Sequence, residues 1–347
     1  MKKITFLSLL SLFTTILINA QATITVDNSQ GADADYSDLQ DAISNALAGD
    51  IIYVHASEIN YGDILIDKEL TLIGFSHSSI DKETIVGTVT LGSAASNTRI
   101  SGFHITNDFF CGNTNTLTNI IIENNLFDGN FSGREIYFFD GGADDVIIRG
   151  NIITSRIGRN FSGPSLQNPV TNLIIANNII TKNIWIDFRE STTIENNIFL
   201  ETPTITNRQS ATGDLEVEDC IFYNASSGNS VGYNNTGVVF NNCLTFNSIS
   251  GVIPLNGSNN INDTDPQFVN VTNPVFDTSF DYNLSPGSDG INNGVLGDDI
   301  GLYSTNSNFT FNNFGFTAGI PIVTITAITS QIAPGGTLDV TIESNSN

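Results

Sequence analysis

Most positively charged residues of this chain lie in one middle segment. The 347-residue sequence carries 36 acidic against 12 basic side chains, a formal charge of −24 at pH 7. Seven of the Lys and Arg residues fall within residues 134–208: Arg134, Arg149, Arg156, Arg159, Lys182, Arg189 and Arg208. Residues 209–347 contain neither type. A basic band in an acidic chain predicts a surface on which an anionic polymer could lie.

One segment of this band has the residue types that recognise a sugar. In residues 183–189 apolar and polar side chains alternate, which predicts a strand with Trp185, Asp187 and Arg189 facing outward. An indole ring can stack on a sugar while charged groups bind hydroxyls or a carboxylate. Comparable neighbouring segments extend this surface. The predicted substrate-binding residues are Tyr137, Arg156, Arg159, Lys182, Trp185, Asp187, Arg189 and Arg208.

These residue types fit binding, elimination or hydrolysis. In a lyase, Arg or Lys would neutralise a uronate carboxylate while Tyr137, Lys182 or an Arg moved the C5 proton. In a hydrolase, the available carboxylates are Asp140, Asp187 and Glu190. The alternative is that these charges form surface ion pairs, which contribute little to the stability of the fold. Because the sequence has no complete catalytic motif, we assign no catalytic residue and favour binding.

An internal repeat indicates which elements position these residues. Six similar segments begin at Ile120, Val146, Leu173, Thr192, Leu215 and Val238, and their equivalent positions recur every 19–27 residues. This period is typical of one coil of a solenoid. Alternate positions in each segment are apolar: Ile122, Ile148, Ile175, Ile194, Val217 and Phe240. The sequence therefore predicts an all-β, right-handed parallel β-helix with these side chains stacked in its core.

A further position is polar or contains sulfur in every repeat. It is occupied by Asn125, Asn151, Asn178, Asn197, Cys220 and Cys243. Asn tolerates the left-handed backbone of a tight bend, and stacked amides can hydrogen-bond along the helix axis. We interpret these residues as a structural ladder rather than a catalytic group. The two cysteines are expected to be buried free thiols, and a strained disulfide between their coils is the alternative.

The ends of the chain have the composition of a leader and two caps. Residues 1–20 combine a charged start, an apolar stretch and a small residue, which predicts a cleavable signal peptide and a secreted protein, extracellular, cell-surface or periplasmic. Residues 21–50 are expected to form an N-terminal cap with one amphipathic helix. Residues 51–305 would form the β-helix. Residues 306–347 would form a β-hairpin extension around Pro334-Gly335-Gly336.

Several segments resemble secreted bacterial proteins of the pectin-lyase-like superfamily. They are YSDLQDAI (36–43), AGDIIYV (48–54) and DKELTLIG (67–74) near the start, with DPQF (265–268), DYNLSPG (281–287) and DIG (299–301) near the end. The resemblance covers residues 36–303 and implies a parallel β-helix with a polysaccharide ligand. That superfamily includes lyases, polygalacturonases, pectin methylesterases and binding proteins. The Gly-His-Gly motif of polygalacturonases is absent from this sequence. Asp187-Phe188 resembles the nucleophile strand of pectin methylesterases but lacks the acid partner one coil earlier. The resemblance therefore implies neither of these two activities.

Charge and composition limit the partners and cofactors. The acidic balance disfavours nucleic acid and anionic membranes, and no stretch after residue 20 is apolar enough to span a membrane. No zinc-type spacing occurs; acidic groups such as Asp298 and Asp299 leave calcium as a weaker alternative. We expect a monomer that binds an extracellular polysaccharide. A lyase of uronate-containing glycans and a structural or adhesive surface module are the alternatives.

Three isoleucines break the inward–outward pattern. Ile121, Ile147 and Ile174 fall on the outward side of their predicted strands. Stacked on neighbouring coils, they would form an apolar strip of a kind that monomers rarely expose. We therefore expect this strip to be covered by a long loop, by the C-terminal hairpin or by a second subunit. We favour the C-terminal segment, which offers the apolar residues Ile320, Ile322, Val323, Ile325 and Ile328.

Overall fold

The computed structural model describes residues 21–78, 83–112, 115–128, 135–138, 142–158, 169–188, 191–201, 205–207, 215–223, 238–247, 254–304, 309–316, 321–328, 335 and 337–346. The predicted signal peptide, residues 1–20, lies outside these ranges. So do Arg134, Asp140, Arg159, Arg189, Glu190 and Arg208.

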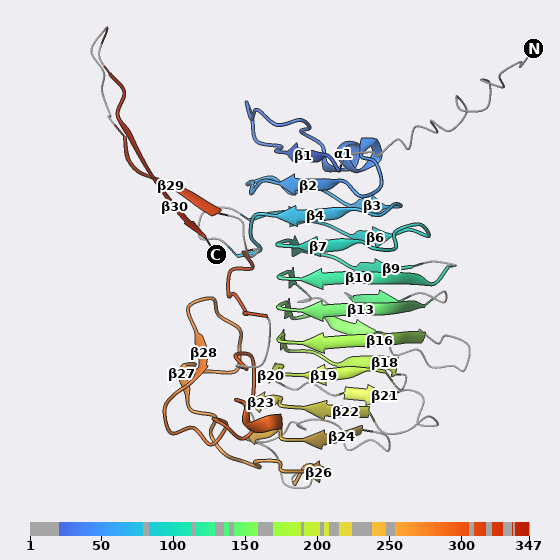
Figure 1. The fold of residues 1–347 in the computed structure, drawn as a ribbon, viewed down its shortest axis with the longest axis vertical. Coiled ribbons are helices and arrows are strands. Elements are labelled where there is room, and N and C mark those ends of the chain that lie inside the picture. Colours follow the sequence, from blue (N-terminus) through green and yellow to red (C-terminus); the bar gives the residue numbers. More distant parts are fainter. Residues whose placement is uncertain are drawn as a thin grey trace, which may run out of the picture.

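The chain forms a parallel β-helix with three walls (Figure 1). The first wall contains β1 (Thr23–Val26), β2 (Ile51–Val54), β4 (Thr71–Gly74), β7 (Arg99–Ser101), β10 (Leu117–Glu123), β13 (Ala143–Arg149), β16 (Pro169–Ala176), β19 (Thr193–Glu195), β22 (Leu215–Glu218), β24 (Val238–Asn241) and β26 (Gly257–Ser258). The second contains β5 (Ile85–Val86), β8 (His104–Ile105), β11 (Leu126–Phe127), β14 (Ile152–Ile153), β17 (Ile179–Ile180), β20 (Ile198–Leu200), β23 (Ile221–Tyr223) and β25 (Leu244–Phe246). The third contains β3 (Ile64–Ile66), β6 (Val89–Leu91), β9 (Phe109–Cys111), β12 (Glu135–Phe138), β15 (Arg156–Gly158), β18 (Ile184–Phe188) and β21 (Ile205–Asn207).

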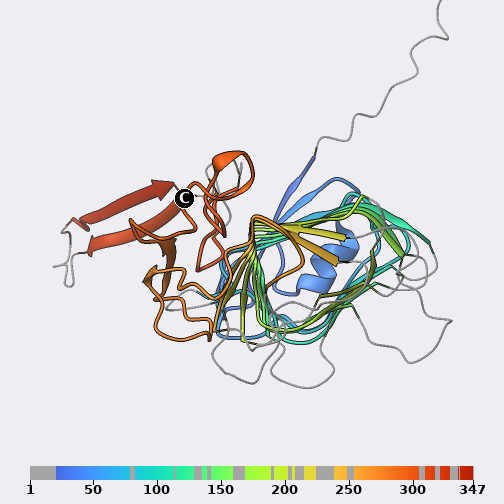
Figure 2. The same cartoon turned by 90° about the horizontal axis from the view of Figure 1, so that it is seen from below.

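The core lies between the three walls, as the view along the stack shows (Figure 2). Parallel pairing aligns Ile122 with Ile148, Ile148 with Ile175, and Ile175 with Ile194. All four side chains are fully buried. The prediction of stacked, inward isoleucines is therefore confirmed. The β-branched side chains suit these strands because each packs on its counterpart one coil away.

The N-terminal cap covers the first coil. Helix α1 (Leu39–Asn45) buries Leu39, Ala42 and Ile43 against the end of the core, and Asp38 caps it by accepting a hydrogen bond from the backbone N–H of Asp41. The outer edge of β1 is also engaged. Asp35 accepts hydrogen bonds from the backbone and hydroxyl of Thr25, which blocks part of an edge that could otherwise pair with another chain.

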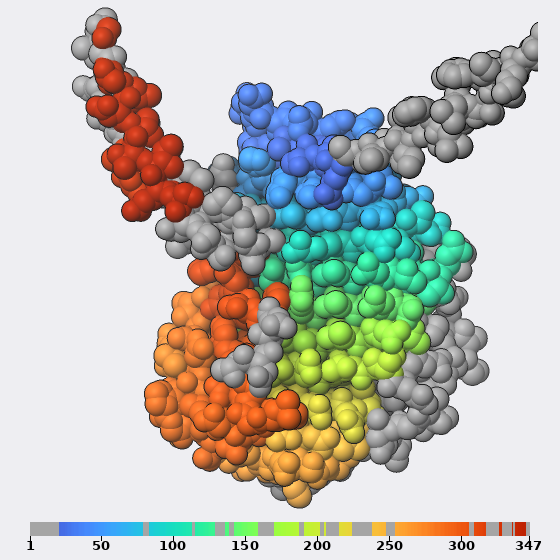
Figure 3. Space-filling model, viewed as in Figure 1, coloured from blue at the N-terminus to red at the C-terminus, as the bar shows by residue number. Residues whose placement is uncertain are grey.

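The C-terminal part packs along the outside of the second wall (Figure 3). It contains β27 (Phe268–Asn270), β28 (Asp281–Leu284) and the short helix η1 (Val295–Gly297). Its side chains Tyr282, Ile300, Leu302 and Phe311 cover an outward apolar column. That column contains Leu126, Ile152, Ile179, Ile198, Ile221 and Leu244. The described parallel strands of the three walls end at β26, and described residues after it supply this cover.

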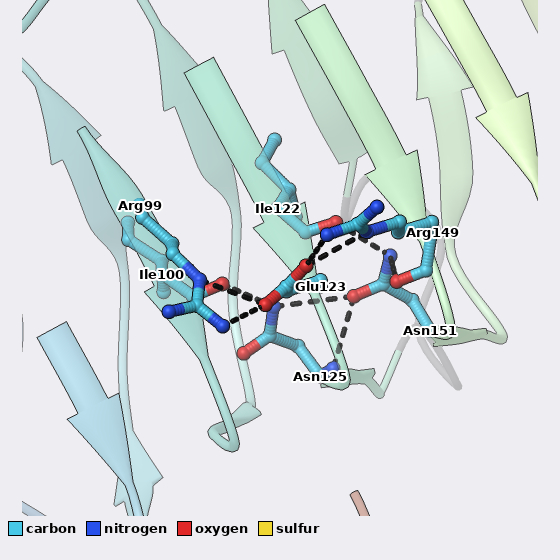
Figure 4. Close-up of polar contacts among 7 residues, drawn as sticks. All are labelled: Arg99, Ile100, Ile122, Glu123, Asn125, Arg149 and Asn151. Carbon is cyan, nitrogen blue, oxygen red and sulfur yellow. Dashed lines mark hydrogen bonds and ion pairs between the residues drawn. The ribbon is translucent and has the colours of Figure 1, made fainter. Parts of the chain in front are cut away.

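The ladder lies at the bend between the first and second walls (Figure 4). Asn125 donates its side-chain amide to the Oδ1 atom of Asn151, Asn151 to Asn178, and Asn178 to Asn197. The next interaction is a weak one from Asn197 to the Sγ atom of Cys220. The left-handed residues are those directly before the ladder, including Asn124, Gly150, Asn177, Asn196, Asp219 and Asn242, each with positive φ. Our assignment of the left-handed backbone to the ladder residues themselves was wrong by one position.

The left-handed bend residues hold a strap, defined as residues 290–304 and 309–316. Asn177 donates its amide to the carbonyl of Leu302, Asn196 to Gly301 and Asn242 to Asn293. At Gly150 the strap approaches more closely: a Cβ atom there would lie 2.2 Å from the Phe309 ring. Glycine both tolerates φ of +66° and leaves room for this ring.

The predicted C-terminal hairpin is present but does not cover the outer isoleucines. Strands β29 (Pro321–Ile328) and β30 (Val340–Ser346) pair antiparallel and extend away from the coils (Figure 1). Residues 337–344 are exposed. The outer isoleucines do stack, Ile121 on Ile147 and Ile147 on Ile174, and each is half-buried. The expected covering role was thus wrong, because the C-terminal residues that form a cover pack on the second wall.

Candidate functional site

The outer side of the third wall carries an aromatic column along the helix axis. Parallel register places Phe110 of β9 beside Tyr137 of β12, and Gly158 of β15 beside Trp185 of β18. Strands β12 and β15 are also neighbours. Because the flanking residues, such as Ile184 and Ile186, are buried inside, these aromatic residues lie on the outward positions.

Trp185 and Arg156 form the centre of this column. The Trp185 side chain is partly exposed, and the Cζ atom of Arg156 lies 5.4 Å from the centre of its ring. This distance is typical of a cation–π contact, which holds both side chains in place. Gly158 makes the close approach of β18 possible, since a Cβ atom there would lie 2.0 Å from the carbonyl oxygen of Trp185.

Tyr137 is less accessible than its outward position suggests. It is 4% exposed, and its ring meets Phe110 edge-on at 6.3 Å between centres. Tyr137 therefore supports the column and does not offer a free face. Phe110, which is partly exposed, was not among the predicted residues. The alternation in Phe109-Phe110-Cys111 could have indicated it, since the first and third residues are buried.

The basic band divides between different parts of the β-helix. Lys182 lies between β17 and β18 and forms an ion pair with Glu201 of the next coil, 2.9 Å from Nζ to Oε2. Arg149 instead belongs to the first wall, where Arg99 and Arg149 both bind the carboxylate of Glu123 (Figure 4). Glu123 is 2% exposed, whereas Arg99 and Arg149 are 33% and 36% exposed, so this cluster is a partly buried set of two ion pairs on another wall.

The remaining predicted site residues add no described side-chain contact. Asp187 lies in β18, where its backbone pairs with Pro169 of β16. Its side chain is outside the description, as are Arg159, Arg189 and Arg208. Of the eight predicted residues, the structure thus brings three, Tyr137, Arg156 and Trp185, onto one surface and places Lys182 at its corner.

A second group of ionisable residues lies away from the aromatic column. Burial raises the pKa of Asp219 to about 6, and its carboxylate accepts a hydrogen bond from the backbone N–H of Val295. Burial and the nearby Glu218 also raise the pKa of Glu195. Asp219 contacts the strap, so its carboxylate belongs to the docking of that segment. Within the described ranges, no group of three or more His, Cys, Asp or Glu side chains is placed to hold a metal ion.

The sequence matches no family model and no curated protein. In the part of the chain that the structure describes, no helix has the length and apolar character needed to cross a membrane.

Proposed function

We propose that this chain is a secreted protein that binds an extracellular polysaccharide on the outer side of its third wall. The observation that carries the proposal is the partly exposed indole of Trp185 with the Arg156 guanidinium over one face of its ring. An aromatic face stacks on the apolar side of a sugar ring, and a guanidinium binds hydroxyl or carboxylate oxygens. The aligned coils repeat at about 4.8 Å, which suits an extended polymer better than a single sugar.

Binding without cleavage is favoured over elimination. Two residues that a lyase would use as acid or base are already engaged, since Tyr137 is 4% exposed and Lys182 is paired with Glu201. A general acid or base must reach the proton that it transfers. The proposal therefore assigns Arg156 and Trp185 to recognition and gives neither a role in bond breaking.

The test uses the intrinsic fluorescence of Trp185, the only tryptophan in the sequence. Polygalacturonate and a neutral β-glucan are titrated separately into the protein, and at least one should change the emission saturably. Trp185→Ala, followed by affinity electrophoresis, should weaken retention about tenfold or more, because one stacking contact is lost. Its melting temperature should stay nearly unchanged.

Tyr53→Ala is the matched control, because Tyr53 is a partly exposed outward aromatic residue on the first wall. It should retain wild-type binding. If neither polymer binds, or if both variants lose retention equally, the proposed site is wrong. Release of unsaturated product from polygalacturonate would show that the protein is a lyase and would contradict binding without cleavage.

A further inference from the structure

Two adjacent rungs of the ladder are cysteines where the preceding rungs are asparagines. Parallel pairing aligns Glu218 with Asn241 and Ile221 with Leu244, so Cys220 and Cys243 lie at equivalent positions between these pairs. Asn260 continues the ladder, since its Oδ1 atom accepts a hydrogen bond from the backbone N–H of Cys243. The cysteines thus replace two consecutive amides inside one otherwise regular column.

The two thiols are neighbours in a fully buried site. Both are free and 0% exposed. The Sγ atom of Cys243 lies 3.4 Å from the carbonyl oxygens of Val217 and Asn241, to which it can donate. Stacked strands are separated by about 4.8 Å. That separation falls within the range of about 4.4–6.8 Å between the Cα atoms of disulfide-bonded cysteines. Cys111, the third cysteine, lies in β9 of the third wall and is not part of the ladder.

We infer that Cys220 and Cys243 are a disulfide-forming pair that joins two consecutive coils when the chain folds with a small-molecule disulfide present. The Cys220 thiolate would attack that disulfide and release one thiol. The Cys243 thiolate would then attack the mixed disulfide, release a second thiol and complete the S–S bond. Two protons leave the cysteines, and the oxidant takes up the two electrons.

The burial of the thiols determines when this reaction happens. Burial raises the pKa of Cys243 well above its ordinary range, so the folded protein contains very little of the reactive thiolate. Oxidation must therefore precede closure of these coils. Once both coils have formed, any cysteine pair that is still reduced is protected from oxidation.

Oxidised glutathione distinguishes these stages. Protein denatured under reducing conditions is refolded with it, and a second sample receives it only after refolding. Thiols are then counted in denaturant, and peptides are mapped by mass spectrometry. The first sample should retain one thiol, Cys111, and contain a 220–243 cross-linked peptide lighter by two hydrogens. The second should retain all three thiols, the number in the sequence.

The double variant Cys220→Asn/Cys243→Asn is the control, because it continues the asparagine ladder. Its melting temperature should be the same with and without oxidant, whereas wild type refolded with oxidant should melt at a higher temperature than reduced wild type. Three thiols after oxidative refolding, or a cross-link that includes Cys111, would refute the inference. This result is independent of polysaccharide binding.

Discussion

Ile147 and Ile148 are neighbours in β13 that face opposite sides of the first wall. Ile148 is fully buried in the core, and Ile147 is half-buried on the outside. Ile148→Ala should lower the free energy of unfolding by roughly 2–5 kcal/mol, because it leaves a cavity between two stacked isoleucines. Urea unfolding measures this loss.

Ile147→Ala is the internal control, since it removes the same atoms from the same strand. It should cost clearly less, because its surroundings include solvent. Equal losses would mean that the outer isoleucines are as tightly packed as the core.

Asn178 shows what a ladder residue contributes at the residue scale. Its amide donates to the carbonyls of Ile148 and Ala176 and to Oδ1 of Asn197. Asn178→Ala would leave buried acceptors without their donor, at roughly 1–3 kcal/mol for each unsatisfied group. The variant should therefore unfold at lower denaturant concentration. Asn283→Ala, which removes an exposed amide bonded to Asp281, should change stability little.

Docking of the strap should depend on pH through His77. His77 is fully buried, its Nδ1 atom contacts the Ser78 hydroxyl, and its backbone N–H donates to the carbonyl of Phe314. Burial lowers its pKa from 6.5 to about 3. Between these values the unfolded chain binds a proton that the folded chain does not. This contribution to stability is therefore intact above pH 6.5 and is lost as the pH falls toward 3.

His77→Asn should remove this component of the pH dependence. The loss of stability on going from pH 7 to pH 4, measured by urea unfolding, should be smaller in the variant than in wild type. His55→Asn serves as the control because the side chain of His55 is 56% exposed. If His77→Asn retains the full wild-type dependence, other groups govern the acid sensitivity.

At the element scale, the repeat predicted the strands and their inward side chains, but it did not predict which wall each candidate site residue would join. Period-two alternation within a coil specifies inward and outward, which is why Ile122 and Ile194 were placed correctly. It does not specify which wall a residue joins. Arg149 and Arg156 are close in sequence, yet they lie on the first and third walls. The basic residues that are close together in the sequence therefore do not form one continuous surface in the structure.

At the scale of the whole molecule, the cover on the second wall should matter more than the hairpin. A chain shortened to end at residue 316 loses strands β29 and β30 and should keep its melting temperature. A chain shortened to end at residue 260 also loses Tyr282, Ile300 and Phe311, which cover the outer apolar column. It should bind a hydrophobic dye strongly or self-associate. Equal dye binding by both chains would contradict this assignment.

The overall architecture followed from the sequence, but this cover did not. In most strands of the second wall two consecutive residues that face opposite sides are both apolar, for example Ile152 and Ile153. Such a pattern indicates a strand that is buried on both faces. Its second partner comes from residues far along the chain with no repeat of their own, so local periodicity could not identify it.

The strap also affects the order in which the chain can fold. Neighbouring coils are built from residues about one repeat apart, so they can form progressively as the polypeptide is synthesised. By contrast, the hydroxyl of Ser76 binds the carbonyl of Phe314, 238 residues later. The strap therefore reaches one of the earliest coils only after the intervening coils have been synthesised. Until then the outer column of the second wall remains uncovered, and aggregation during this interval competes with completion of the native protein.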